Sequence, residues 1–524
     1  CLNRPTRLYP LPSLWEAAGG GAGGEEAAAP AAKAAPARCL TPSLYFAHMP
    51  RLSPDGRTLA FAAREGEFRS HSAGFELRTM AWPPPEAGHG SATLVPIVRG
   101  FPAATDGSSF AGLFGFHDEL ASLAWLDEAT LVFHSVAGAT KSTFTVAATG
   151  GEATGGEATG GDAPRGGLAP PVVPLRPPQC EGSVELLGAS GGTAIVQCSS
   201  LRRLPSVWAV KDGEWTCLVD VGGLVEKHDA GPHCEQARAA LRELRSARLE
   251  KVRLPEEEGG AEALCLLPAG ASRAPWTLKI HGGPHSASLD SWSVEVALLL
   301  ASGVCVIQPN YRGSIGFGDD FCAALPGHVG EMDVCDCVAL TRASLAQLDE
   351  SLDPARGGAY GGSHGGFLTA WLLGCEERAL YSCGVLWNPV VDLPAMLGTT
   401  DIPEWVSAEG LQGDAAGADA TWPVGAEDLL ELHRRSPLSV IDRVEAPALM
   451  LLGATDQRVP HKQGRSWVSA LQQVRQRKGA PADLTALEFP GEGHAIASLE
   501  GNAHAQQSAV AWLVERLRGE SNAS

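Results

Sequence analysis

From about residue 246 onward, short apolar strands alternate with helical segments, and this alternation restricts the possible folds more than any other feature of the chain. The expected strands cover residues 276–280, 304–308, 448–452 and 484–489, and the expected helices cover 293–301, 332–348, 367–373 and 505–518. Such alternation is typical of a doubly wound, mostly parallel α/β sheet. We therefore expect residues 246–524 to form an α/β domain.

Residues 1–245 have a different pattern, with many short strand-like runs separated by turn residues and little helix up to about residue 230. In the clearest example, the tight turn Pro54-Asp55-Gly56 leads into an apolar run. Further strands are expected at 123–125, 130–134, 144–147, 194–197 and 206–210. Repeated β-meanders of this kind are found in β-propellers. Two low-complexity stretches, at about 19–38 and 149–167, are expected to be surface loops.

The pattern G-x-S-x-G occurs twice, around Ser190 and around Ser363, and its context separates the two copies. Ser190 lies between two strand-like runs, which predicts a hairpin turn. Ser363 is followed by an apolar pattern compatible with a helix, which predicts a strand-turn-helix elbow that exposes a nucleophilic hydroxyl. One feature disagrees, because the strand expected before Ser363 is rich in glycine and has poor β-propensity. A structural turn at Ser363 is the alternative.

A serine nucleophile needs a base and a carboxylate that orients the base. Asp456 follows the expected strand at 448–452, and His494 lies on a small-residue loop after the strand at 484–489. Taken singly, a loop aspartate more often caps a turn, and most of the 15 histidines are expected to be incidental. Ser363, Asp456 and His494 nevertheless follow one another in the order expected for this fold.

The oxyanion of an acyl-transfer reaction needs two hydrogen-bond donors. The backbone N–H of His364, directly after Ser363, is one candidate. The loop His281-Gly282-Gly283-Pro284-His285 follows the strand at 276–280 and can supply the second N–H. A metal bound by His281 and His285 is the rival interpretation. We discount it because Gly-Gly-Pro prevents the helix on which an H-x-x-x-H pair binds a metal.

Composition limits the partners and the compartment. A formal charge of −20 argues against nucleic-acid or anionic-membrane partners. The longest apolar run, residues 294–307, is shorter than a membrane helix requires. Thirteen cysteines without a framework spacing favour a reduced, cytoplasmic setting. No cofactor and no metal are expected. Because the chain begins at Cys1 rather than Met, we expect a fragment or a processed product.

Several motifs together resemble the prolyl oligopeptidase superfamily of serine peptidases. They are HGGPH at His281, NYRGSIGFG at Asn310, GGSHGGF at Gly361, SPL at Ser436, RVP at Arg458 and GHA at Gly493. The segment NPVVDLPAMLGTTDIPEW, from Asn388 to Trp405, is similar to the acylaminoacyl-peptidase branch. The resemblance covers nearly all of residues 246–524 and is weaker in the β-rich half.

The resemblance implies a peptidase that removes an N-acylated amino acid from short peptides. By position, Ser363 is the nucleophile, His494 the general base and acid, and Asp456 its orienter. Gly283 and His364 would supply the oxyanion N–H groups. Arg458 would line the substrate pocket, although a structural ion pair is about as plausible for it. A blade of four strands takes roughly 40–50 residues, so residues 1–245 allow at most about four blades of an incomplete propeller.

Two other functions stay open from the sequence. One is a dipeptidyl-peptidase or carboxylesterase on the same fold, although no convincing acidic pair for a free amino terminus is present. The other is a truncated, inactive protein in which the remnant of the propeller binds partners. The preferred acyl group and the oligomeric state, including a homo-oligomer, are not determined by the sequence.

Overall fold

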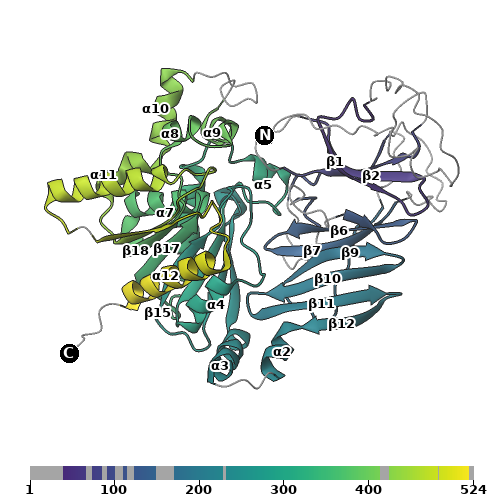
Figure 1. Cartoon of the computed structure of the whole chain (residues 1–524), viewed down its shortest axis with the longest axis horizontal. Coiled ribbons are helices and arrows are strands. Elements are labelled where there is room, and N and C mark those ends of the chain that lie inside the picture. The colour runs from purple at the N-terminus through teal and green to yellow at the C-terminus, as the bar shows by residue number, and fades with distance from the viewer. Residues whose placement is uncertain are drawn as a thin grey trace, which may run out of the picture.

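The computed structural model describes residues 39–66, 73–84, 91–100, 110–114, 123–148, 170–227, 232–412, 424–481 and 483–518. Within these ranges, three antiparallel sheets precede one large α/β sheet with helices on both faces (Figure 1). The predicted fold class, an α/β-hydrolase fold preceded by an incomplete propeller, is confirmed. Both low-complexity stretches predicted to be loops lie outside the described residues.

The large sheet has the strand order β13-β14-β16-β15-β17-β18-β19-β20. From β16 onward in this order, each strand pairs parallel with the next. The β13–β14 and β14–β16 pairs are antiparallel. The carboxyl ends of the parallel strands therefore meet along one edge, which is where α/β proteins bind ligands. The strands are β13 (Arg248–Arg253), β14 (Glu262–Leu267), β15 (Ala274–Ile280), β16 (Cys305–Asn310), β17 (Leu352–Gly362), β18 (Cys383–Trp387), β19 (Ala448–Gly453) and β20 (Leu484–Phe489).

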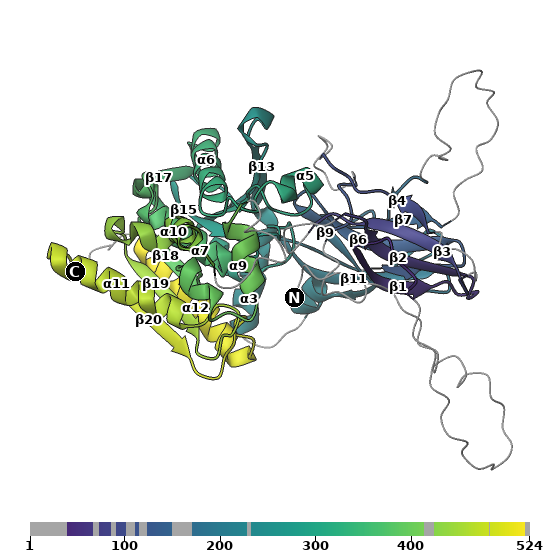
Figure 2. The ribbon, with the colours of Figure 1, turned by 90° about the horizontal axis from the view of Figure 1, so that it is seen from above.

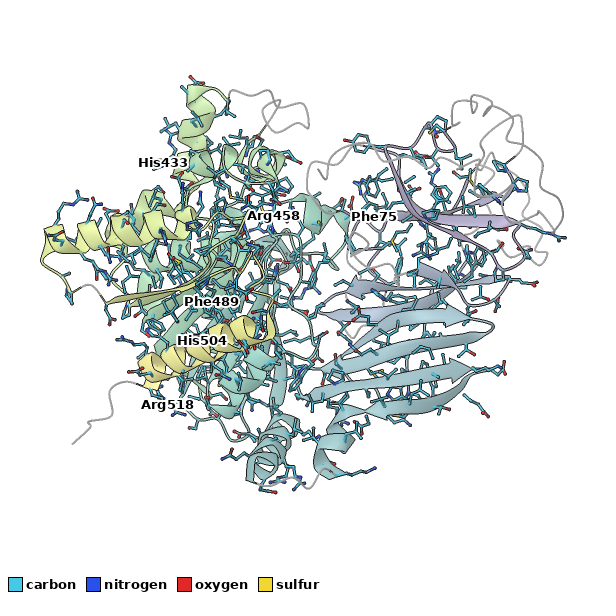
Figure 3. The ribbon with its side chains drawn as sticks, in the orientation of Figure 1. Phe75, His433, Arg458, Phe489, His504 and Arg518 are labelled. Carbon is cyan, nitrogen blue, oxygen red and sulfur yellow. The ribbon has the colours of Figure 1, made fainter. Side chains whose placement is uncertain are left out.

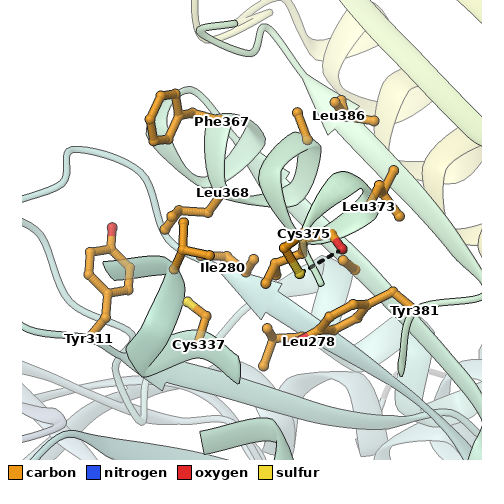
Figure 4. Close-up of a cluster of buried hydrophobic side chains, with 14 of the residues drawn as sticks. Leu278, Ile280, Tyr311, Cys337, Phe367, Leu368, Leu373, Cys375, Tyr381 and Leu386 are labelled. Carbon is orange, nitrogen blue, oxygen red and sulfur yellow. Dashed lines mark hydrogen bonds between the residues drawn. The ribbon is translucent and has the colours of Figure 1, made fainter. Parts of the chain in front are cut away.

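Helices bury apolar side chains against both faces of this sheet. Helices α6, α7 and α11 contribute to one core, and α3, α4 and α12 contribute to the other. Figure 4 shows part of the first core, where side chains of α7 such as Phe367 and Leu373 lie near Leu278 and Ile280 of β15. The helices are α3 (Pro232–Ser246), α4 (Val294–Ala301), α5 (Asp319–Ala323), α6 (Met332–Gln347), α7 (His364–Gly374), α8 (Leu393–Leu397), α9 (Pro403–Gly410), α10 (Ala426–Arg434), α11 (Lys462–Lys478) and α12 (Leu499–Arg518).

The β-rich half contains three four-stranded antiparallel sheets among the described residues. Their first strands follow one another in space, because β5 lies against both β1 and β9, as in successive blades of a propeller. The sheets comprise β1 (Phe46–Leu52), β2 (Thr58–Arg64), β3 (Glu76–Ala81) and β4 (Ala92–Val95); β5 (Leu123–Trp125), β6 (Thr130–Ala137), β7 (Thr140–Ala147) and β8 (Val173–Pro174); and β9 (Ser183–Ser190), β10 (Thr193–Ser200), β11 (Arg203–Lys211) and β12 (Glu214–Asp220).

Two helices before residue 246, α2 (Val221–Lys227) and α3, were not expected from the sequence. Helix α3 is rich in exposed charged residues and buries Leu241 and Leu244 in the core that α4 and α12 share. Its apolar stripe is narrow, so the helical period of its apolar residues is weak in the sequence. The strand-like runs before it dominate the local pattern. No helix of the described ranges is long and apolar enough to span a bilayer.

The β-rich half contacts the α/β half through the loops that follow β15 and β16 (Figure 2). The Gly138 N–H donates to the Gly316 carbonyl over 2.7 Å, and the Asp290 N–H donates to the Ala139 carbonyl over 2.7 Å. Arg64 of β2 forms a two-pronged ion pair with Asp319, with N–O distances of 2.9 and 3.0 Å. Since both loops start at the carboxyl edge of the sheet, the β-rich half docks beside that edge.

Candidate active site

Ser363 occupies the sharp turn between β17 and α7, as predicted. Its backbone has φ +56° and ψ −120°, a conformation that L-residues rarely adopt. The Ser363 N–H donates to the Trp387 carbonyl of β18 over 2.9 Å, which anchors the turn to the neighbouring strand. Strained backbone of this kind clusters at functional sites, and a nucleophile elbow places its serine in this way.

Packing explains the glycines around Ser363. A Cβ atom on Gly361 would lie 2.2 Å from the Gly365 carbonyl oxygen, and one on Gly365 would lie 2.3 Å from the Ile280 carbonyl oxygen. Gly357 of β17 leaves room for Trp276, since a Cβ there would lie 2.1 Å from the indole ring. The segment is thus a strand despite its poor β-propensity because close neighbours, not intrinsic preference, select glycine.

The second G-x-S-x-G match forms a hairpin turn, as predicted. Ser190 ends β9 and pairs with Thr193 of β10. Gly191 and Gly192 between them both have positive φ, at 57° and 77°, as two-residue hairpin turns require. Neither Gly188 nor Gly192 would bring a Cβ within 4 Å of another atom. Ser190 therefore lacks the crowded elbow of Ser363.

Asp456 and His494 lie on the loops after β19 and β20 and form a hydrogen bond. His494 Nδ1 is 2.7 Å from Asp456 Oδ2. The other carboxylate oxygen, Oδ1, accepts the N–H groups of Arg458 and Val459, each over 2.9 Å. The Asp456 side chain is fully buried, whereas that of His494 is 31% exposed. This geometry fixes the imidazole orientation and leaves Nε2 for a reacting proton.

Ser363 belongs to the same edge of the sheet, but its hydroxyl forms no hydrogen bond with His494 or with any other described residue. The structure therefore brings together the predicted base and its orienter, and places the predicted nucleophile on its elbow. The hydrogen bond between Ser363 and His494 is not formed. In unliganded enzymes such contacts are often long and shorten only when substrate binds.

The two predicted oxyanion donors lie on adjacent loops. A Cβ on Gly282 would lie 3.3 Å from Ser363 Cβ and 3.8 Å from the His364 nitrogen, so the loop after β15 packs against the elbow. Among the described residues, neither the Gly283 nor the His364 N–H donates a hydrogen bond to the protein. His364 begins α7, where the first N–H groups of a helix have no intrahelical acceptor.

The ring nitrogens of His281 and His285 contact protein groups in this structure. His281 stacks on Tyr311 at 4.4 Å between ring centroids, and its Nε2 lies 2.9 Å from the Ser314 hydroxyl. Burial lowers the pKa of His281 to about 3. His285 Nδ1 lies 2.6 Å from the Gly313 carbonyl oxygen, and its Nε2 faces the Glu409 carboxylate. The sequence pattern identified these histidines but not their partners, which are distant in the chain.

The imidazole of His364 points away from the reacting side, into the protein. Its Nε2 lies 2.8 Å from Asp333 Oδ2 of α6, and both side chains have no exposed surface. The Asp333 Oδ1 atom also accepts the N–H groups of Gly330 and Val334. Since Asp333 accepts from Nε2 and no described residue contacts Nδ1, the ring proton resides on Nε2. Asp333 therefore fixes the residue whose N–H is the predicted oxyanion donor.

Asn388 is a further site residue that the sequence reasoning did not single out. Its amide donates to the His494 carbonyl over 2.8 Å, and its side-chain oxygen accepts the Gly453 N–H over 2.8 Å. Asn388 has φ +41°, which asparagine tolerates better than most residues. It ties the loop of His494 to the end of β19. Its place directly after a buried strand is the sequence signal that would have revealed it.

Arg458, which is labelled in Figure 3, was predicted to line the pocket or to form an ion pair. In this structure it forms an ion pair. Its Nε is 2.7 Å from Asp401 Oδ1, and both side chains are nearly half exposed. An exposed pair of this kind contributes about 0–1 kcal/mol to stability. A substrate-binding role for Arg458 remains a prediction.

Comparison with known proteins shows which proteins this chain is similar to. Residues 290–520 match the model of the prolyl oligopeptidase family, and residues 1–157 match that of the N-terminal domain of the acylamino-acid-releasing enzyme. Acylamino-acid-releasing enzyme 1 of Oryza sativa subsp. japonica is 28% identical over 512 residues, which cover 95% of this chain and 61% of that protein. The Mus musculus acylamino-acid-releasing enzyme is 36% identical over 259 residues, which cover 49% and 34%.

Among solved structures, the Pyrococcus horikoshii acylaminoacyl peptidase superposes with a TM-score of 0.67 at 16% identity. The match covers 94% of this chain and 66% of that protein, and at this identity it shows the fold. The resemblance to acylaminoacyl-peptidases that the motifs indicated is confirmed. The chain spans 61% of the length of the rice relative and 34% of that of the mouse relative.

Proposed function

We propose that this chain, whose residues 290–520 match the model of the prolyl oligopeptidase family, is a serine peptidase that releases an N-acylated amino acid from the N-terminus of short peptides. One observation carries the proposal. Ser363 is held at φ +56° between β17 and α7, at the sheet edge where His494 is hydrogen-bonded to Asp456. The names of the relatives, acylamino-acid-releasing enzymes, supply the substrate class.

In the proposed reaction, Ser363 Oγ attacks the carbonyl carbon of the first, acylated residue. His494 Nε2 takes the hydroxyl proton, and Asp456 stabilises the imidazolium that forms. The N–H groups of Gly283 and His364 bind the oxyanion of the tetrahedral intermediate. The carbon–nitrogen bond then breaks, and His494 gives its proton to the leaving amine. Water, activated by His494, hydrolyses the acyl-enzyme and restores the Ser363 hydroxyl.

Three further features belong to the proposal. Arg458 would exchange its contact with Asp401 for a carbonyl oxygen of the substrate. The chain would divide at residue 245 into an incomplete propeller and a catalytic domain. The setting would be cytoplasmic, as the thirteen cysteines suggest, and none of the eleven whose side chains the structure describes forms a disulfide. None of these features is needed for the chemistry at Ser363.

Hydrolysis of acetyl-alanyl p-nitroanilide and of unblocked alanyl p-nitroanilide tests this function. The chain is expected to cleave only the blocked substrate, and Ser363→Ala is expected to abolish cleavage. Ser190→Ala is the matched control, because Ser190 has the same sequence pattern in a hairpin turn, and it is expected to retain full activity. Cleavage of the unblocked substrate would instead favour an enzyme that accepts a free amino terminus, and cleavage that survives Ser363→Ala would remove Ser363 from the mechanism.

A further inference from the structure

The last histidine of the loop after β15 is joined to a carboxylate of α9. The side chains of His285 and Glu409 have no exposed surface. His285 Nε2 lies 3.1 and 3.2 Å from the two Glu409 carboxylate oxygens. Its Nδ1 lies 2.6 Å from the Gly313 carbonyl oxygen, which can only accept a hydrogen bond. Nδ1 therefore carries a proton, and Nε2 is free to donate a second one to Glu409.

The charge of the ring agrees with this reading. Burial by itself lowers the pKa of His285, but the Glu409 carboxylate and Cys322, whose sulfur is 3.5 Å from Nδ1, together raise that pKa well above the ordinary value. The two residues thus form a buried imidazolium–carboxylate pair. Apolar side chains of similar volume are often as stabilising as such a pair. The presence of the His285–Glu409 pair is therefore better explained by the geometry that it imposes on the loop after β15.

Gly283, the source of one oxyanion N–H, is tightly folded against His285. Its backbone has φ +118°, and a Cβ there would lie 2.7 Å from the backbone nitrogen of His285. Because these backbone atoms are so close, a displacement of His285 also displaces the Gly283 N–H. A shift of about 1 Å at a catalytic group can cost 10²-fold in rate.

Helix α9 is well placed to hold this pair, because the helix and the residues just before it contact the elbow of Ser363 and the loop of Asp456. Trp405 packs edge-on against His364, at 6.1 Å between ring centroids. The Asp401 N–H, just before α9, donates to the Gln457 carbonyl beside Asp456. At the other end, the Gly327 N–H donates to the Glu409 carbonyl. Glu409 therefore projects from a helix that is fixed at both ends.

We propose that Glu409 is a positioning residue, which acts through His285 to hold the Gly283 N–H where the oxyanion forms. The inference rests on the proposed function, since it requires acyl transfer at Ser363. Glu409 touches no reacting atom. Its effect is exerted on the transition state, where the oxyanion exists, and not on the bound substrate.

The test compares Glu409→Gln, His285→Gln and the double variant in the full chain. With acetyl-alanyl p-nitroanilide, we expect Glu409→Gln to lower kcat about ten-fold, less than the 10²–10³ that outright loss of an oxyanion donor costs. KM is expected to change by no more than about two-fold. The inhibition constant of an acetyl-alanyl trifluoromethyl ketone, whose hemiketal oxygen occupies the oxyanion position, should rise by the same factor as kcat falls. The double variant should be no worse than the poorer single variant.

Leu471→Ala controls for a general loss of stability, because Leu471 is buried in α11 within the same domain. It is expected to lower the melting temperature and leave kcat unchanged. An unchanged kcat in Glu409→Gln, or losses that add in the double variant, would overturn the inference. So would an equal kcat loss in Leu471→Ala.

The rate at which a fluorophosphonate labels Ser363 separates this inference from the proposed function. If the unmodified chain is labelled but cleaves no acylated substrate, the proposed substrate is wrong, and slower labelling of Glu409→Gln still supports the positioning role. Equal labelling rates would contradict that role. If the unmodified chain is not labelled at all, both proposals fail.

Discussion

At the scale of single residues, His281 and His285 show how partners decide the charge of a histidine. Both lie on the loop after β15. Burial against Tyr311 and Ser314 lowers the pKa of His281 to about 3 and keeps it uncharged. His285 is also buried, but Glu409 and Cys322 together raise its pKa well above the ordinary value. The sequence placed both residues beside the site. It could not predict their charges, because these depend on residues that only the fold brings close.

Arg458 provides a prediction at this scale. Because its ion pair with Asp401 is nearly half exposed, we expect Arg458→Gln to change the free energy of unfolding by no more than about 1 kcal/mol. If the guanidinium binds a substrate carbonyl, the same substitution raises KM about ten-fold, the effect of a lost charged hydrogen bond. Steady-state kinetics and urea unfolding measure the two effects.

Asp401→Asn is the matched control for Arg458. It removes the ion pair but keeps the guanidinium, so KM is expected to stay near that of the unmodified chain. An equal rise of KM in both variants would mean that the pair, and not Arg458 itself, shapes the site. An unchanged KM in Arg458→Gln would remove Arg458 from substrate binding.

At the scale of elements, the strand β17 and its elbow show where local preference fails. The glycines of β17 argued against a strand, yet neighbouring atoms at 2.1–2.2 Å from any added Cβ on Gly357 and Gly361 explain why glycine is required. The alternation of strands and helices predicted a mostly parallel α/β sheet, although β13, β14 and β18 were not among the expected strands. Helices α2 and α3 were missed because they follow the propeller-like strands directly.

The two G-x-S-x-G copies make this argument testable. Gly361→Ala places a Cβ against the Gly365 carbonyl, which belongs to the backbone and cannot move aside. We expect it to lower the free energy of unfolding by about 3 kcal/mol or more, the upper range for overpacking. Urea unfolding followed by circular dichroism measures the change.

Gly188→Ala is the control in the other copy. No atom lies within 4 Å of its Cβ position, so we expect a change of no more than about 1 kcal/mol, the usual difference between glycine and alanine in a strand. A larger loss from Gly188→Ala than from Gly361→Ala would contradict the account of the elbow.

At the scale of the whole molecule, the β-rich half docks on the loops that follow β15 and β16, and one of these loops carries Gly283, the proposed oxyanion donor. The Arg64–Asp319 ion pair and the hydrogen bonds of Gly138 and Ala139 join the halves there. The sequence predicted both halves, and the order of Ser363, Asp456 and His494 predicted the site. The supporting residues Asp333 and Glu409 could not be predicted, because each acts through contacts between distant segments, whereas the position of Asn388 directly after a buried strand was a usable signal.

The central claim is that Ser363 is an activated nucleophile in this chain. The most direct measurement treats the full chain with a fluorophosphonate and locates the adduct by peptide mass spectrometry. We predict one adduct per chain on Ser363, absent from Ser363→Ala and formed at least about 10²-fold more slowly in His494→Ala, which lacks the base. An adduct on another residue, or no adduct on a folded sample, would contradict the claim.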